Sequence, residues 1–318
     1  MKKFEDKLIA EFGNFETSRF GVNYMPPKVF LCGGEVDVKA YIPKSLRDRL
    51  IGYFAEHEEE LSTSCIQAEN FKDYFQEGAY QDLLEFESDI ANIATLIIVC
   101  LESPGSMVEL GMFCMDPSII SKLLVVAPFE ETKNEDSFIF LGPLQYIKRL
   151  DQGSVLTYPW PEKEVHEYEH LPMLVNDIKN RLHQMQKSQK FNMQNSSHIA
   201  FLIHDVIMLS NPITLNEIEY ALLALRLTVE QKKITRLLYL LEKIDLIYHA
   251  SYGNVIYYYD RPGSTRRLKF GLDLKGRIRD SQSMALAFRS VYISNDDELS
   301  RRRYLAAQHV RKLKEQMK

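Results

Sequence analysis

The sequence predicts an α/β fold with a largely parallel sheet flanked by helices, followed by a second, mainly α-helical domain. Its 318 residues, 45% hydrophobic and 26% charged, suffice for two globular domains with buried cores. Over the first half of the chain, short apolar runs alternate with segments of helical periodicity, a pattern typical of parallel strands joined by crossover helices. In the second half, three helical segments precede a predicted hairpin.

Four apolar runs predict buried strands, and a weaker run at 64–68 adds a candidate strand. The four runs are 28–32 (KVFLC), 95–101 (TLIIVCL), 122–127 (KLLVVA) and 155–158 (VLTY). Helical spacing of apolar residues predicts helices at 43–61, 79–94, 107–115 and 143–150. Ligand sites in parallel sheets lie beyond the carboxyl ends of the strands. The loops after Cys32 and Leu101 are therefore the candidate site.

The domain boundaries follow from a change of pattern near residue 190. Residues 1–190 form the predicted sheet domain, with a last polar helix and a linker between 159 and 197. Residues 198–280 form the predicted second domain. Residues 281–318 form a basic C-terminal helical tail.

The second domain has the element order of a winged helix. Helices are predicted at 198–209, 214–225 and 229–243, and a Thr214-x-x-Glu217 capping box opens the second of them. A hairpin with its turn at Gly253-Asn254 follows. Three helices and a hairpin are the winged-helix variant of the helix-turn-helix.

Charge is distributed unevenly along the chain. The net charge is −5, but residues 261–318 hold fifteen Lys/Arg and six Asp/Glu, a net +9, which leaves −14 for residues 1–260. This asymmetry favours a basic region that contacts polyanions, although a solvated basic helix gives the same count. The residues predicted to bind nucleic acid or a partner lie in the third helix and beyond the hairpin: Lys232, Lys233, Arg236, Arg266 and Arg267. Tyrosines interleaved near the hairpin suit single-stranded nucleic acid.

Cysteine usage and hydropathy predict a cytoplasmic protein. The four cysteines form no CxxC pair and have no zinc spacing, so we expect free thiols and no metal site. No run of 18 apolar residues predicts a transmembrane helix, and acidic residues interrupt any signal-peptide core at the start of the chain. We therefore expect no membrane contact.

The stretch from Glu102 to Gly111 (ESPGSMVELG) carries the strongest chemical signal. It follows a buried strand and opens a helix, whose N-terminal amides favour negative charge. Gly105 suits a tight backbone turn. Glu109 is the candidate catalytic carboxylate. The alternative for Glu109 is structural, because Ser106-x-x-Glu109 also reads as a capping box.

Further candidate ligand contacts lie around the same predicted edge. Gly33 and Gly34 end the first strand and allow a ligand to approach the backbone, although an ordinary turn explains them equally well. Glu69 follows the candidate strand at 64–68 and is a candidate contact for a ribose hydroxyl. Glu87, on the helix before the third strand, is within reach of the same edge.

Three segments carry a resemblance to a known family. FLCGG, ESPGSMVELGMF and FLGPLQYIKRL resemble, in order and spacing, retron effectors that combine a nucleoside 2-deoxyribosyltransferase-like domain with a winged helix, from about residue 25 to about residue 260. The resemblance implies that Glu109 is the catalytic glutamate and that Gly33 and Gly34 contact the nucleotide. It also implies that Ser103, Gly105 and Ser106 hold the sugar or phosphate.

The resemblance further implies a function. Such effectors are toxins of bacterial anti-phage systems, held inactive by a reverse transcriptase and its multicopy single-stranded DNA (msDNA), and we expect an oligomer within that complex. The sequence departs from the transferases in having Cys-Gly-Gly-Glu after the first strand. Some relatives of this retron type hydrolyse NAD, so the resemblance implies an N-glycosidase that hydrolyses NAD as its substrate and needs no cofactor.

Two other functions remain open at this point. One is a nucleoside deoxyribosyltransferase or a hydrolase of free nucleotides. The other is a non-enzymatic DNA-binding regulator whose α/β domain senses a nucleotide. NAD is favoured because its nicotinamide carries a formal positive charge and leaves as a neutral molecule, so no strong general acid is required.

Overall fold

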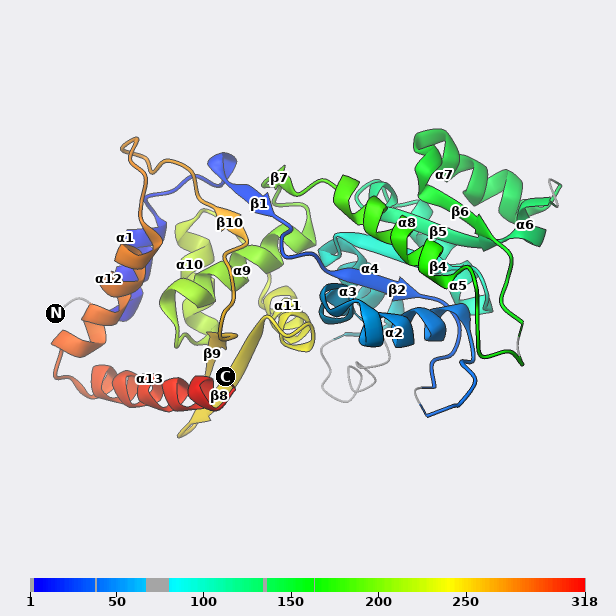
Figure 1. Cartoon of the computed structure of the whole chain (residues 1–318). Helices are drawn as coiled ribbons and strands as arrows, with labels where there is room; N and C mark the ends of the chain where they lie inside the picture. The colour runs from blue at the N-terminus through cyan, green and yellow to red at the C-terminus, as the bar shows by residue number, and fades with distance from the viewer. Residues whose placement is uncertain (1–2, 38, 67–79, 134–135, 163, 318) are drawn as a thin grey trace. The chain divides into compact units, whose positions relative to one another are not determined.

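The computed structural model describes residues 3–317, except 38, 67–79, 134–135 and 163 (Figure 1). The chain divides into two compact units. One, the sheet unit, holds the described residues of 24–73 and 82–187. The other, the helical unit, holds those of 1–23, 74–81 and 188–318.

The sheet unit alternates strands and helices. Its elements are β2 (Val29–Cys32), α2 (Leu46–His57), α3 (Glu59–Ser64), β3 (Cys65–Ile66), α4 (Leu83–Ile93), β4 (Leu96–Cys100), α5 (Pro104–Cys114), β5 (Leu123–Pro128), α6 (Phe129–Lys133), a π-helical turn (Phe140–Leu144), α7 (Gln145–Leu150), β6 (Val155–Tyr158) and α8 (Leu171–Gln184). The predicted strands at 28–32, 95–101, 122–127 and 155–158 are confirmed. The predicted helix at 43–61 is two helices, because Glu58, at φ −138° and ψ 73°, is not helical and interrupts it.

The five strands form one parallel sheet in the order β3-β2-β4-β5-β6. Val29 pairs with Leu96 and Cys32 with Val99, so β2 and β4 end together. Strand order reverses between these two strands, since the chain moves to β3 on one side of β2 and to β4 on the other. Ligands of open α/β sheets bind at such a switch point, outside the carboxyl ends of the strands.

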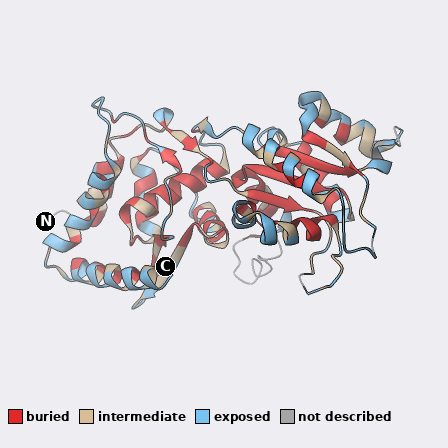
Figure 2. Cartoon of the chain, viewed as in Figure 1, coloured by how far each residue is buried: buried red, intermediate tan, exposed pale blue. Residues whose placement is uncertain are grey.

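Helices cover both faces of this sheet. Leu31 and its neighbours on one face pack against Leu50 of α2 and Leu174 of α8. Phe30 points to the other face, where its ring lies 6.2 Å from that of Phe113 on α5. The strands are therefore buried along most of their length (Figure 2), as their continuous apolar runs predict.

The helical unit contains the predicted three helices and hairpin together with further elements. They are α1 (Phe4–Phe12), β1 (Gly21–Asn23), β7 (Ser188–Lys190), α9 (Ser196–Ser210), α10 (Leu215–Ala224), α11 (Gln231–Lys243), β8 (Ile247–Tyr252), β9 (Val255–Asp260), β10 (Leu268–Lys269), α12 (Ser281–Ser294) and α13 (Glu298–Gln316). The Thr214–Glu217 capping box is present at α10. The β8–β9 turn has Gly253 at φ +60°, a conformation that glycine adopts without strain.

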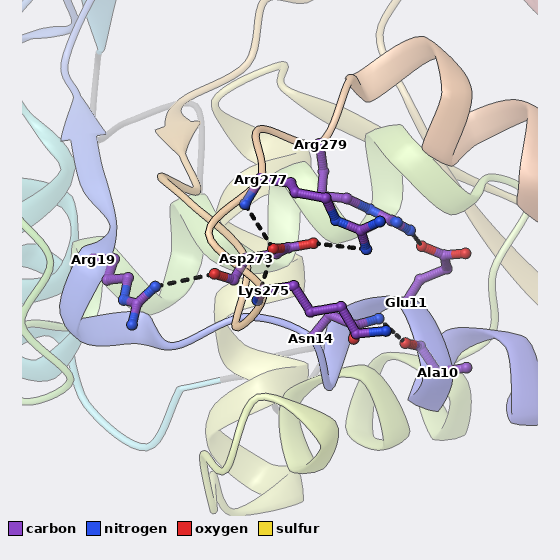
Figure 3. Close-up of polar contacts among 8 residues, drawn as sticks. All are labelled: Ala10, Glu11, Asn14, Arg19, Asp273, Lys275, Arg277 and Arg279. Atoms are coloured by element: carbon purple, nitrogen blue, oxygen red, sulfur yellow. Dashed lines mark hydrogen bonds and ion pairs between the residues drawn. The ribbon is translucent and has the colours of Figure 1, made fainter.

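The N-terminal segment belongs to the helical unit, whereas the sequence assigned residues 1–190 to the sheet domain. β1 pairs antiparallel with β7 and β10, so the described residues up to Asn23 and residues 188–190 join the second unit. Figure 3 shows the loop before α12 held by this segment. Asp273 accepts a hydrogen bond from the backbone N–H of Arg277 at 2.9 Å, Arg19 Nη1 donates to the Asp273 carbonyl at 3.0 Å, and Arg279 pairs with Glu11. Nothing local in the sequence signals this pairing.

Residues 281–318 also pack into this unit and do not form a separate tail. Arg303 on α13 is buried, donates to the Pro212 carbonyl at 2.6 Å and pairs with Glu217 of α10. Lys314, near the other end of α13, pairs with Asp260 at 2.6 Å. Two of the basic residues counted toward a polyanion-binding region, Arg303 and Lys314, therefore hold α13 in place.

Candidate active site

Two loops meet at the carboxyl ends of β2 and β4. Gly33 and Gly34 follow β2, and Glu102 and Ser103 follow β4. The Ser103 hydroxyl donates to the Gly33 carbonyl at 3.1 Å, and Glu102 Oε1 accepts from the Gly34 amide at 2.9 Å. The two motifs noted in the sequence are therefore bonded directly to each other at the switch point of the sheet.

The cap of α5 differs from the predicted one. Ser103 is the N-cap, and its Oγ accepts from the Ser106 amide at 3.1 Å while Ser106 Oγ accepts from the Ser103 amide at 3.1 Å. The capping box thus joins Ser103 and Ser106, and the interpretation of Glu109 as the capping carboxylate is wrong. Ser106 is fully buried, and its hydroxyl bonds within the cap. Ser106 therefore stabilises the start of α5 and offers no exposed surface to a ligand.

Glu109 lies half-buried on α5. The pKa of the Cys32 thiol is raised well above its usual value, first by burial and then by the negative charges of Glu109 and Glu87. The pKa of the Cys100 thiol is likewise raised, by burial and then by Glu102, with a smaller effect of Glu109. Carboxylates from α4, α5 and the β4–α5 loop therefore gather around the ends of the two central strands.

The structure brings most of the predicted site residues to this edge. The negative charges of Glu109 and Glu87 both raise the pKa of the Cys32 thiol. Glu87 is buried on α4, with 7% of its surface exposed. Ser103 contacts the Gly33 carbonyl directly. Glu69 lies outside the described residues, so its contact with a ribose hydroxyl stays a prediction.

The two glycines after β2 make room for the protein's own side chains. A Cβ on Gly33 would lie 2.8 Å from both Arg47 Cβ and Glu102 Oε1, and one on Gly34 would lie 2.7 Å from Ser45 Cβ. Gly105 is different, because it is an exposed residue of α5 and the nearest atom to a Cβ there is 3.7 Å away. Gly105 therefore does not form the tight turn predicted for it.

This difference predicts opposite effects of two alanine substitutions. Gly33→Ala should lower the free energy of unfolding by about 1–3 kcal/mol, since the new methyl group would clash with Arg47 and with the carboxylate of Glu102, which backbone hydrogen bonds hold in place. Gly105→Ala should leave the free energy of unfolding unchanged or raise it by up to about 1 kcal/mol, because alanine is the better helix former. Urea unfolding of both variants measures this. Equal destabilisation by the two substitutions would contradict the geometry.

Sequence reasoning missed two residues of the site, Glu102 and Arg47. Arg47 on α2 is buried with 5% exposure, and its charge partly offsets the carboxylates by lowering the pKa of both Cys32 and Cys100. Glu102 stands directly after a buried strand, a position that could have singled it out. Arg47 had no such signal, because it reads as one of several charges on an amphipathic helix.

The basic residues predicted to bind nucleic acid fall into two groups. Arg267 is 1% exposed and Arg266 pairs with Asp205 at 3.2 Å, and the buried Asp205 also accepts from the Arg267 amide at 2.8 Å. These two arginines thus join the segment that follows the β8–β9 hairpin to α9. Because Arg267 is buried, it has no exposed surface that could bind a phosphate. Lys232 is exposed and Lys233 half-buried on α11.

Arg236, also on α11, stacks over the Tyr80 ring at 5.5 Å. Among the residues that the structure describes, no helix is long and apolar enough to span a membrane. In the same part of the chain, no group of three His, Cys, Asp or Glu residues is arranged to hold a metal ion.

Fold and site define an α/β protein with carboxylates gathered at the switch point of a parallel sheet. A family model described as "STM3845 retron effector protein" matches residues 43–249, more than half of the chain. The chain belongs to this family of retron effectors.

Two curated relatives come from Escherichia coli. One, named "Retron Ec73 putative ribosyltransferase/DNA-binding protein", is 32% identical over 160 residues, 45% of this chain and 49% of the relative. The other, named "Retron Ec86 putative ribosyltransferase/DNA-binding protein", is 31% identical over 129 residues, 40% of this chain and 39% of the relative. The chain thus spans half or less of the length of these relatives.

Proposed function

We propose that this retron effector is an N-glycosidase that hydrolyses NAD and acts as the toxin of an anti-phage system. The observation that carries the proposal is the position of Glu109. Its negative charge contributes to the raised pKa of the Cys32 thiol at the end of β2, and Ser103 and Ser106, not Glu109, form the capping box of α5. The names of the two relatives, which include ribosyl transfer, support chemistry at a ribosyl carbon.

The proposed chemistry is cleavage of the bond between C1′ of the ribose and the nicotinamide nitrogen. Positive charge builds on C1′ as that bond breaks, and a carboxylate beneath the carbon stabilises it. Nicotinamide takes the bonding electron pair and leaves neutral. Water then adds to C1′ and releases a proton. Glu109 supplies the stabilising carboxylate, while Glu87 and the Gly33–Gly34 loop contact the substrate.

The test is incubation of the purified protein with NAD and, separately, with deoxynucleotides, in the presence and absence of its retron partner. Release of nicotinamide from NAD supports the proposal. Release of a free nucleobase from deoxynucleotides alone supports instead a deoxyribosyltransferase or nucleotide hydrolase. Stable binding of nucleotide and DNA with no cleavage in any condition supports a DNA-binding regulator.

The proposed partners are the reverse transcriptase of the retron and its msDNA, which hold the toxin inactive within an oligomeric complex. Membership of the retron effector family supports this context. The element order α9, α10, α11 and the β8–β9 hairpin agrees with a winged helix that contacts nucleic acid. The "DNA-binding" in the relatives' names supports the same assignment.

The surface lysines of α11 give this nucleic-acid contact a test. The double substitution Lys232→Glu and Lys233→Glu should weaken binding of a single-stranded oligonucleotide. It should also reduce the slope of log K against log salt by about 1.4, if each lysine neutralises one phosphate. Fluorescence anisotropy over a salt series measures both quantities. Lys148→Glu, on α7 of the sheet unit, is the control. An unchanged slope in the double variant would exclude α11 as the contact.

A further inference from the structure

Glu102 has an unusual set of hydrogen-bond donors. Its Oε1 accepts from the backbone amides of Gly34 at 2.9 Å and Arg47 at 3.1 Å, and its Oε2 accepts from the amide of Leu46 at 2.7 Å. Leu46 and Arg47 are the first two residues of α2. One half-buried carboxylate therefore accepts hydrogen bonds from three backbone N–H groups, one just after β2 and two in the first turn of α2.

This arrangement is an anion site that the chain fills itself. The first amides of a helix have no partner within the helix, and the helix dipole makes them attractive to negative charge. The Ser45 side chain caps the Asp48 amide at 3.0 Å, and Glu102 takes the amides of Leu46 and Arg47 that remain. A substrate phosphate therefore has to be held by other groups, because the donors of this helix end are already bonded.

Glu102 also links the two loops of the candidate site. It lies two residues after the end of β4 and seven residues before Glu109, whereas its three donors are Gly34, just after β2, and the first two residues of α2. The Ser103 hydroxyl makes a second link between the same loops, through the Gly33 carbonyl. The space that Gly33 and Gly34 leave by lacking a Cβ is taken up in part by Glu102 itself.

We infer that Glu102 is a positioning residue, a built-in anion that fixes the Gly33–Gly34 loop and the start of α2 relative to the β4–α5 segment that carries Glu109. It does not touch substrate. Its effect on catalysis rests on the proposed function, but its occupancy of the amide site does not. Loss of the carboxylate frees three N–H groups and allows the loop to move away from Glu109.

Three variants and one small anion test this inference. Glu102→Ala leaves a space of carboxylate size lined by three amides, which formate fits. Glu102→Gln fills that space, but the NH2 group of the glutamine side chain then faces backbone N–H groups and cannot accept their hydrogen bonds. Asp151→Ala is the matched control, since it removes a carboxylate that accepts from the Gly153 amide and pairs with Arg181 at 2.6 Å, before β6 at the opposite edge of the same sheet.

Two measurements are made with sodium formate and with sodium chloride at equal ionic strength. Hydrogen exchange over residues 33–47 should accelerate in Glu102→Ala and return toward the wild-type rate with formate only. The kcat for glycosidic cleavage should fall about a hundredfold with a smaller change in KM, as expected when a catalytic group is misplaced by about 1 Å, and formate should restore it. Glu102→Gln should not respond to formate, and Asp151→Ala should keep the wild-type kcat.

Three results would overturn the inference: wild-type hydrogen exchange in Glu102→Ala, accelerated exchange that formate does not slow, or a wild-type kcat in Glu102→Ala. If the wild-type protein cleaves no substrate, the proposed function fails, and hydrogen exchange alone then decides whether Glu102 fixes the loop.

Discussion

Glu109→Gln is expected to abolish release of nicotinamide from NAD, with a loss of about a thousandfold or more in kcat, or at least ~4 kcal/mol of transition-state stabilisation. The substitution keeps the size of the side chain and removes only its charge, on which stabilisation of a cationic ribosyl carbon depends. Because Ser103 and Ser106 cap α5, the variant should unfold at the wild-type urea concentration. Toxicity in cells should be lost in parallel.

The matched control for this substitution is Glu58→Gln. Glu58 lies at the far end of α2 and pairs with Lys179 at 2.9 Å, so its loss removes a carboxylate and an ion pair from the same unit. Cleavage should be unchanged in this variant. Full NAD consumption by the Glu109→Gln protein would show that this carboxylate is not the catalytic group and would remove the main support for an N-glycosidase.

The second large effect concerns the stability of the sheet unit and its dependence on pH. Lys122 precedes β5 and is 5% exposed, with Nζ 2.5 Å from the Asn92 carbonyl and 5.0 Å from the centre of the Tyr24 ring. Burial lowers its pKa from 10.5 to about 7, against a smaller raising effect of Asp116. The folded state therefore disfavours the charged ammonium.

The sign of the pH dependence follows from this lowered pKa. Between pH 7 and 10.5 the unfolded chain binds more protons at Lys122 than the folded chain, so stability rises with pH across that window. The full span is about 5 kcal/mol, at 1.36 kcal/mol for each pKa unit. Below pH 7 the buried ammonium destabilises the folded state by this full amount, and above pH 10.5 the destabilisation vanishes.

Lys122→Met should remove this contribution. The variant should be more stable than the wild type at pH 7 and lose that advantage progressively toward pH 10.5, as measured by urea unfolding over a pH series. Lys187→Met, at an exposed lysine, should show no such trend. A Lys122→Met protein that is less stable at pH 7, by an amount that does not vary with pH, would contradict the prediction.

The central strands β2, β4 and β5 were predictable because each is a continuous apolar run whose residues are almost all buried. Thr95–Leu101 is the clearest case, and β4 occupies Leu96–Cys100 with every residue buried. The candidate site followed from the same pattern, since a parallel sheet brings the carboxyl ends of its strands to one edge. Glu109 and the Gly33–Gly34 loop were found in this way.

Local patterns failed where a contact joins distant parts of the chain. Ser106-x-x-Glu109 has the spacing of a capping box, which was the structural alternative for Glu109, but the observed backbone starts α5 at Pro104, so the cap is formed by Ser103 and Ser106. The sequence indicates surface charge at Arg267, yet the residue is buried. Its backbone amide donates a hydrogen bond to the buried Asp205 of α9, which lies 62 positions away in the sequence.

The sequence alone predicted the parallel sheet and singled out Glu109 and a candidate site at the strand ends, because periodicity and strand ends are local properties of the chain. Only the tertiary structure decided that Glu102 fills the helix end at α2, that residues 1–23 belong to the second unit, and which basic residues are buried. Each of these depends on pairings between segments far apart in the chain, and such pairings leave no periodic trace in the sequence.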